Sequence, residues 1–212
     1  LTTLFISNNL YAMDNMHDHN SKQHDHNSHV AVNAPNENLD VLAQSFNLKN
    51  INDKMVSLEN AKGLNGTVIV FICNHCPYVK AIASRLKKDA DDLLEHSINT
   101  IAIMSNDVIN YPDDSFDNMK IFSNKYKFNF PYLYDETQEV AKTYDAVCTP
   151  DFFGFDKDLK LKYRGRIDSG VMNENPNSYI ERDLFNAMIK IKNEGVGPSN
   201  QMNSIGCSIK WK

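Results

Sequence analysis

The sequence predicts one α/β domain built on a central mixed β-sheet with helices on both faces. Residues 67–72 form a continuous apolar, β-branched run of the kind that fills a buried central strand. Residues 79–94 repeat apolar side chains at helical spacing, with charged side chains on the opposite face. Strand and helix patterns then alternate along the chain, which favours a sheet covered on both sides.

The remaining elements are expected on both sides of this strand–helix unit. Before it, residues 46–48 and 55–58 flank the turn-prone pair Asn52–Asp53, which indicates an N-terminal β-hairpin extension. After it we expect a strand at 98–104, a helix at 115–126 capped by Ser115, a strand at 132–134, a helix at 137–144, a hairpin of 152–155 with 160–164, and a final helix at 178–193 that ends at Gly195.

Composition sets the class of protein. The 212 residues are 42% hydrophobic and 23% charged, which is ordinary for a soluble globular domain. The net charge is -5 and no long Lys/Arg run occurs, so a nucleic-acid partner is not expected. No apolar stretch approaches the roughly 20 residues that span a bilayer. We place the domain at 39–212, with a C-terminal tail over 196–212.

The first 38 residues differ from this domain. Residues 1–12 are largely apolar and end on a small residue, which we interpret as the remnant of a secretory signal and hence of export to the periplasm or another extracytoplasmic space. The alternative is an incidental apolar segment of a cytoplasmic protein. Residues 13–38 are predicted to be disordered, because they have too little apolar surface to offset their ordering entropy.

This disordered segment is rich in histidine. Together with two aspartates its imidazoles form a candidate weak site for copper or zinc, although a solvated spacer explains the same composition. The histidines are His17, His19, His24, His26 and His29.

Two of the four cysteines have the spacing of a redox pair. Cys73 ends the predicted central strand and Cys76 begins the following helix, with Pro77 in the first turn. Because helix N-terminal amides favour an anion, the pKa of Cys73 is expected to fall below its usual value, and His75 would favour the thiolate further. The alternative, half of a zinc site, lacks partners: Cys148 and Cys207 are isolated and His96 is the only histidine downstream.

These motifs together resemble a known family. Cys73-Asn74-His75-Cys76-Pro77, then residues 147–153, 163–168 and 206–211, resemble the thioredoxin-like superfamily. Within it they are most similar to the redoxin branch grouped with alkyl hydroperoxide reductase and thiol-specific antioxidant proteins. The resemblance covers about residues 40–212 and implies a thioredoxin-like fold.

The resemblance also implies roles for single residues. Cys73 matches the exposed nucleophilic cysteine and Cys76 the buried resolving one. Thr149–Pro150 matches the loop whose cis-proline faces the pair, and Arg166 matches the arginine of the family's peroxidases. No cofactor is implied beyond the redox-active disulfide, and the implied partners are protein thiols and disulfides.

The leading hypothesis is therefore a thiol–disulfide oxidoreductase. A peroxiredoxin-like antioxidant peroxidase is the alternative, but its Pro-x-x-x-Thr/Ser-x-x-Cys motif is missing. The two motif positions hold Gly66 and Val70 when counted from Cys73, and Ile69 and Cys73 when counted from Cys76. A copper-delivery protein is the third possibility, supported only by the histidine-rich segment.

The other two cysteines stay open at this stage. Cys148 precedes Pro150 by two residues, so it is either a third redox partner or, as we favour, a small buried apolar group. Cys207 lies in the C-terminal tail. It is a candidate third redox thiol, an anchor for the tail, or a residue without a role.

Overall fold

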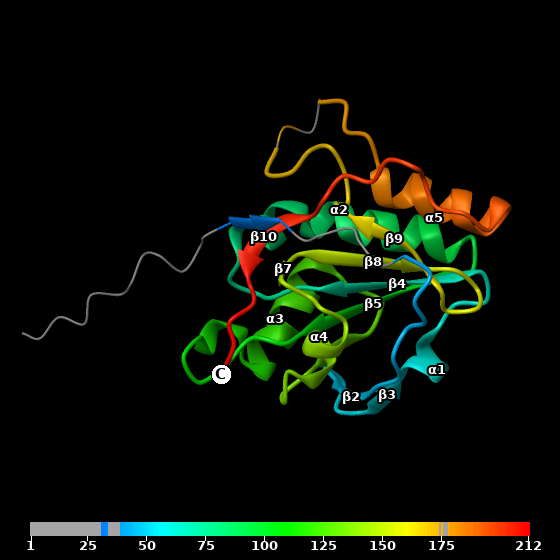
Figure 1. Ribbon diagram of the computed structural model, residues 1–212. Helices are drawn as coiled ribbons and strands as arrows, with labels where there is room; N and C mark the ends of the chain where they lie inside the picture. Colours follow the sequence, from blue (N-terminus) through cyan, green and yellow to red (C-terminus); the bar gives the residue numbers. More distant parts are fainter. Residues whose placement is uncertain (1–30, 34–38, 174, 176–177) are drawn as a thin grey trace, which may run out of the picture.

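A seven-stranded mixed sheet forms the centre of the computed structural model, which describes residues 31–33, 39–173, 175 and 178–212 (Figure 1). The strand order is β3-β2-β6-β5-β4-β8-β9. Its strands are β2 (Asn47–Asn50), β3 (Met55–Ser57), β4 (Gly66–Phe71), β5 (Ile98–Met104), β6 (Tyr132–Tyr134), β8 (Asp151–Phe155) and β9 (Leu161–Gly165). The predicted α/β class, the N-terminal hairpin and the β8–β9 hairpin are all confirmed.

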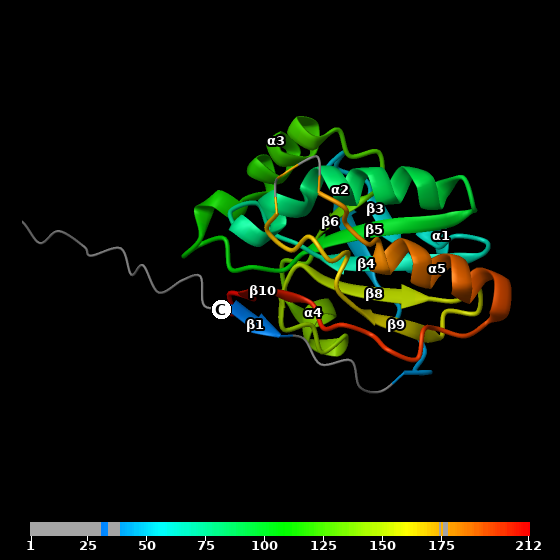
Figure 2. The ribbon, with the colours of Figure 1, turned by 90° about the horizontal axis from the view of Figure 1, so that it is seen from above.

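Helices cover both faces of this sheet because the side chains of the buried central strand β4 alternate between them. Val68 and Val70 pack in one core together with residues of the helices α2, α3 and α5. Ile69 and Phe71 pack in a second core together with residues of α1 and α4. The helices are α1 (Leu58–Ala61), α2 (Pro77–Leu94), α3 (Phe116–Tyr126), α4 (Glu139–Thr143) and α5 (Asp183–Glu194). Figure 2 shows α2 and α5 side by side over the sheet.

A second, three-stranded sheet lies at one end of the molecule. It contains β1 (Ala31–Asn33), β10 (Ile205–Ser208) and β7 (Cys148–Thr149), in the order β1-β10-β7 and antiparallel throughout. In Figure 1 the red strand β10 lies beside the blue strand β1. The first and last strands of the described chain therefore pair with each other, and β10 also pairs with β7, which carries Cys148.

Three features of the terminal regions differ from the sequence predictions or go beyond them. Ala31–Asn33, within the segment expected to be disordered, form β1. The C-terminal tail is ordered from 205 to 208 as β10, because it finds strand partners on both sides. The last helix begins at Asp183 rather than near residue 178. The amide of Ser169 donates to the carbonyl oxygen of Glu181, and the amide of Leu184 donates to that of Ile167, at 3.0 Å each. The chain just before the helix therefore pairs with the 167–169 segment.

Three sequence predictions lie outside the described residues. These are the signal remnant at 1–12, the disorder expected over 13–30 and 34–38, and the candidate metal ligands His17, His19, His24, His26 and His29. Within the described part of the chain, no helix has both the length and the apolar character needed to cross a membrane.

Candidate active site

The two cysteines of the Cys-x-x-Cys motif lie where β4 passes into α2. The amide of Ile72 still bonds the carbonyl oxygen of Ile103 at 2.9 Å, so the sheet pairing continues to the residue before Cys73. Cys76 is the N-cap of α2 and Pro77 is its first residue, where the missing N–H costs nothing. The predicted strand-to-helix placement of the pair is confirmed.

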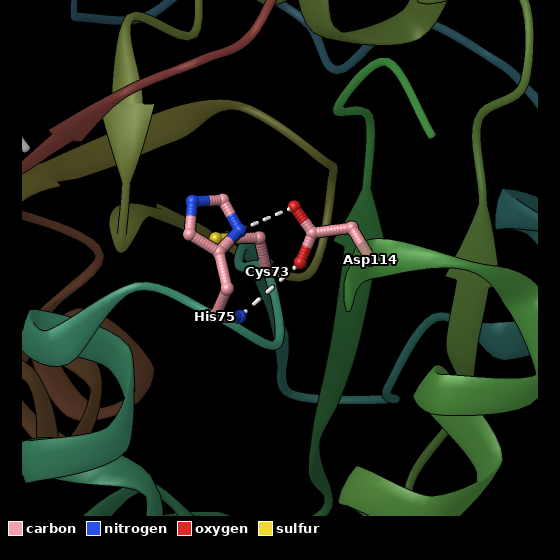
Figure 3. A group of neighbouring side chains, drawn as sticks. All are labelled: Cys73, His75 and Asp114. Atoms are coloured by element: carbon pink, nitrogen blue, oxygen red, sulfur yellow. Dashed lines mark hydrogen bonds and ion pairs between the residues drawn. The ribbon is translucent and has the colours of Figure 1, made fainter. Parts of the chain in front are cut away.

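A buried carboxylate, Asp114, holds this loop in shape (Figure 3). Its oxygens accept hydrogen bonds from the amides of Asn74 (2.7 Å) and His75 (3.2 Å). They also contact Nδ1 of His75 at 2.6 Å and accept from the Asn106 side chain at 2.8 Å. Asp114 has no exposed surface, so these four contacts replace the water that an ionised carboxylate requires.

The opposite wall of the site is the loop at Thr149. Its hydroxyl lies 3.3 Å from Sγ of Cys73, and its carbonyl oxygen accepts a hydrogen bond of 3.2 Å from the Cys76 thiol. The peptide bond between Thr149 and Pro150 is cis, as the family resemblance implied. One residue of this loop therefore contacts both thiols.

A third thiol, that of Cys207, joins the pair. Cys207 is the strand partner of Thr149 in the β10–β7 ladder and packs in the same buried core as Cys73 and Cys76. The thiols of Cys207 and Cys73, and the amides of Val79 and Cys207, donate to the Cys76 sulfur and lower the pKa of Cys76. All four cysteines of the chain are free thiols.

Two expectations for Cys73 are wrong. The side chain is fully buried rather than exposed. Its pKa is raised, first by burial and then by the neighbouring Cys76 and the charge of Asp114. The start of α2 acts on Cys76 instead, because Cys76 is the N-cap residue and the amide of Val79 contributes to the lowered pKa of its thiol.

His75 is positioned mainly by Asp114. Its imidazole stacks on the Tyr111 ring, with 5.8 Å between centroids and 13° between ring planes. The ligand atoms of Cys73, His75 and Asp114 lie within 4.8 Å of one another, which is a donor set for a metal such as zinc. Both oxygens of Asp114 already accept protein hydrogen bonds, however, and this favours a structural role for the carboxylate.

The remaining predicted site residues lie further out. Cys148 is buried, its thiol donates to the carbonyl oxygen of Pro150 at 3.3 Å, and burial raises its pKa. Because side chains alternate along a strand, Cys148 points away from the face on which Thr149 meets the thiols. Arg166 pairs with Asp183 at 2.5 Å and lines a hollow beside Pro150 that also includes Tyr78.

Sequence reasoning missed Asp114 and the amides around it. Asp114 ends a short 3-10 helix, η2 (Pro112–Asp114), that lies about forty positions after the cysteines. The Pro-Asp-Asp sequence marks a turn, but it carries no sign of the distant residues that its last carboxylate binds. Tyr132, whose hydroxyl donates to the Asn74 side chain at 2.9 Å, was also placed only as a strand residue.

A paired cysteine motif at a strand-to-helix junction, facing a cis-proline loop, defines the class of thioredoxin-like redoxins. Two solved structures match this chain over most of their own length. An uncharacterized conserved protein from Geobacillus kaustophilus is 45% identical, with a TM-score of 0.81, and the match covers 86% of this chain and 97% of that one. A hypothetical protein from Sinorhizobium meliloti 1021 is 31% identical, with a TM-score of 0.79 over 85% and 98%.

A more distant match agrees in fold. The thioredoxin domain of a thiol-disulfide oxidoreductase from Bacteroides vulgatus is 15% identical, with a TM-score of 0.52 over 60% of this chain and 87% of that one. The sequence profile of the AhpC/TSA family matches residues 40–164. The chain belongs to the AhpC/TSA family. No curated protein matched the chain.

Proposed function

We propose that this protein is a thiol–disulfide oxidoreductase for protein substrates, with Cys73 and Cys76 as the exchanging pair. The observation that carries the proposal is the double contact of Thr149, which bonds both sulfurs from a cis-proline loop. A disulfide forms only between two sulfurs that can reach bonding distance. Thr149 contacts both sulfurs, and Asp114 fixes the backbone between the two cysteines.

The exchange follows from the hydrogen bond between the two sulfurs. The pKa of Cys76 is lowered, and in its thiolate form Cys76 accepts a hydrogen bond from the Cys73 thiol. When the Cys73 proton passes to Cys76, Cys73 attacks one sulfur of a partner disulfide. The partner's S–S bond breaks, and its other sulfur leaves as a thiolate.

The second step releases the partner. Cys76 loses its proton to solvent and its thiolate attacks Sγ of Cys73 in the mixed disulfide. The Cys73–Cys76 bond forms, and the bound partner sulfur leaves with the electron pair. The partner is reduced by two electrons and the pair is oxidised by two. The same steps in reverse oxidise a partner dithiol.

Burial of Cys73 adds a requirement for access. Cys73 has no exposed surface, so a folded partner reaches its sulfur only after a local opening of the surrounding chain. A peroxide molecule is smaller and would need less opening. The proposal therefore has to be tested against peroxidase activity directly.

The test is capture of partners with Cys76→Ser, which leaves the mixed disulfide on Cys73 unresolved. We expect Cys73-linked protein adducts that dithiothreitol releases, and insulin reduction by wild type that falls at least a hundredfold in Cys73→Ser. Cys148→Ser is the matched control, since it removes a buried thiol that faces away from the pair. Absence of both adducts and insulin reduction, with rapid consumption of hydrogen peroxide, would instead assign a peroxidase.

A further inference from the structure

Strand β10 brings Cys207 to the Cys73–Cys76 pair from the far end of the chain. Its register with β7 places Cys207 opposite Thr149, the residue that contacts both other sulfurs. On its other side Cys207 lies opposite Ala31 of β1. Both views show β10 beside β1 (Figures 1 and 2). A strand that pairs along both edges is held in position, so Cys207 is a fixed part of the site.

Gly206 shows how closely this strand approaches. A Cβ atom at position 206 would lie 2.2 Å from the carbonyl oxygen of Thr149 and 2.9 Å from the nitrogen of Pro150. Only glycine permits such an approach to another backbone. Because a one-residue slip would turn Cys207 to the opposite face, this contact also fixes where its thiol points.

The sulfur of Cys76 is the one that both other thiols contact. Cys76 receives hydrogen bonds from the thiols of both Cys73 and Cys207. All three side chains belong to one buried core, which does not include Cys148. Cys76 therefore has two neighbouring sulfurs with which a disulfide can form.

We propose that Cys207 is a third exchange thiol, which takes over the disulfide from the Cys73–Cys76 pair. This inference rests on the proposed function and extends it by one step. The thiolate of Cys207 attacks Sγ of Cys76, the Cys76–Cys207 bond forms and the Cys73–Cys76 bond breaks. The electron pair stays on Sγ of Cys73, which takes up the proton lost by Cys207, so no external oxidant or reductant is consumed.

The charges around Cys207 favour this order of events. In the fully reduced state the hydrogen bond with Cys76, burial and the charge of Cys76 raise the pKa of Cys207, while Lys210 lowers it. Once Cys76 is bonded in a disulfide, its hydrogen bond and its charge no longer raise the pKa of Cys207, although burial still does. The thiolate of Cys207 therefore forms more readily when there is a disulfide to attack. The product leaves Cys73 as a free thiol for a second partner.

Disulfide mapping of wild-type protein tests the proposal without any variant. After oxidation by one equivalent of diamide and quenching in acid, we expect a mixture of the Cys73–Cys76 loop and a Cys76–Cys207 cross-link between two tryptic peptides. Cys73→Ser should form the Cys76–Cys207 link alone. Cys207→Ser should hold only the Cys73–Cys76 loop, with alkylation of Cys73 at least tenfold slower than in oxidised wild type. Cys148→Ser should give the wild-type mixture.

The outcomes separate this proposal from the one on which it rests. Formation of the Cys73–Cys76 loop without a Cys76–Cys207 link, in both wild type and Cys73→Ser, would overturn the relay and leave the oxidoreductase intact. Failure of the Cys73–Cys76 loop to form in Cys207→Ser would overturn the proposed function itself.

Discussion

Replacing Asp114 with asparagine keeps the shape of the side chain but removes one acceptor oxygen and the charge. The remaining oxygen can still accept from the amides of Asn74 and His75, as Oδ1 does now. The new amide nitrogen would face the Asn106 side-chain nitrogen, now 2.8 Å away, and Nδ1 of His75. Two donors would then meet where a donor and an acceptor meet in the native protein.

The expected cost follows from these contacts. A buried donor left without its acceptor costs about 1–3 kcal/mol, and hydrogen bonds to a charged acceptor are worth more than neutral ones. We therefore expect Asp114→Asn to lower the free energy of unfolding by about 2–4 kcal/mol. The charge of Asp114 also contributes to the raised pKa of Cys73, so the pKa of Cys73 should fall in this variant. The fall should be smaller than the part of the rise that burial causes.

Urea unfolding measures the first effect, and the pH dependence of Cys73 alkylation measures the second. Asp113→Asn is the matched control, because Asp113 is an exposed neighbour on the same short helix and should stay within about 0.5 kcal/mol of wild type. If Asp114→Asn unfolds like this control and alkylates like wild type, Asp114 does not hold the cysteine loop and our reading of the site is wrong.

Three further results are expected. Gly206→Ala should force β10 away from Thr149, costing about 1–3 kcal/mol in urea unfolding and exposing Cys207 to alkylation; unchanged stability and protection would refute the close approach. Thiolate absorbance near 240 nm should persist at pH values below the usual pKa of cysteine and vanish in Cys76→Ser, because the pKa of Cys76 is lowered. Loss of this absorbance in Cys73→Ser alone would show that Cys73 carries the lowered pKa. Burial raises the pKa of Asp89 to about 6, so its protonated form stabilises the fold below about pH 4, and this stabilisation is lost as the pH rises to about 6. The free energy of unfolding should fall by up to about 3 kcal/mol over this pH range. The fall should be absent from Asp89→Asn, in which Arg182 keeps its ion pair with Asp92 at 2.7 Å. The same fall in Asp89→Asn as in wild type would contradict the role of Asp89.

Local sequence patterns were sufficient for most of the fold. The apolar run at 67–72 and the periodic helix after it are dictated by neighbours in sequence, so both were predicted from residue spacing alone. The junction between them places Cys73 and Cys76, and this part of the site was also predictable. The proline at 150 was identified through family resemblance rather than from spacing.

Long-range contacts explain what was missed. Asp114 reaches the cysteine loop across about forty positions, and β10 pairs with β7 across nearly sixty. A single sequence contains no signal for such pairings, because each partner alone reads as a turn or a short tail. The burial of Cys73 was missed for the same reason, since tertiary contacts, not its place after a strand, decide its exposure.

A redox titration of Cys207→Ser tests the Cys73–Cys76 pair directly, because this variant removes the relay and leaves the pair. In glutathione buffers of graded potential, alkylation and mass spectrometry give the fraction of chains in which both thiols are lost. We expect one transition of two-electron steepness, in which a tenfold change in the ratio of oxidised to reduced protein takes about 30 mV. Two thiols that stay free at every potential, or that react with glutathione independently, would contradict it.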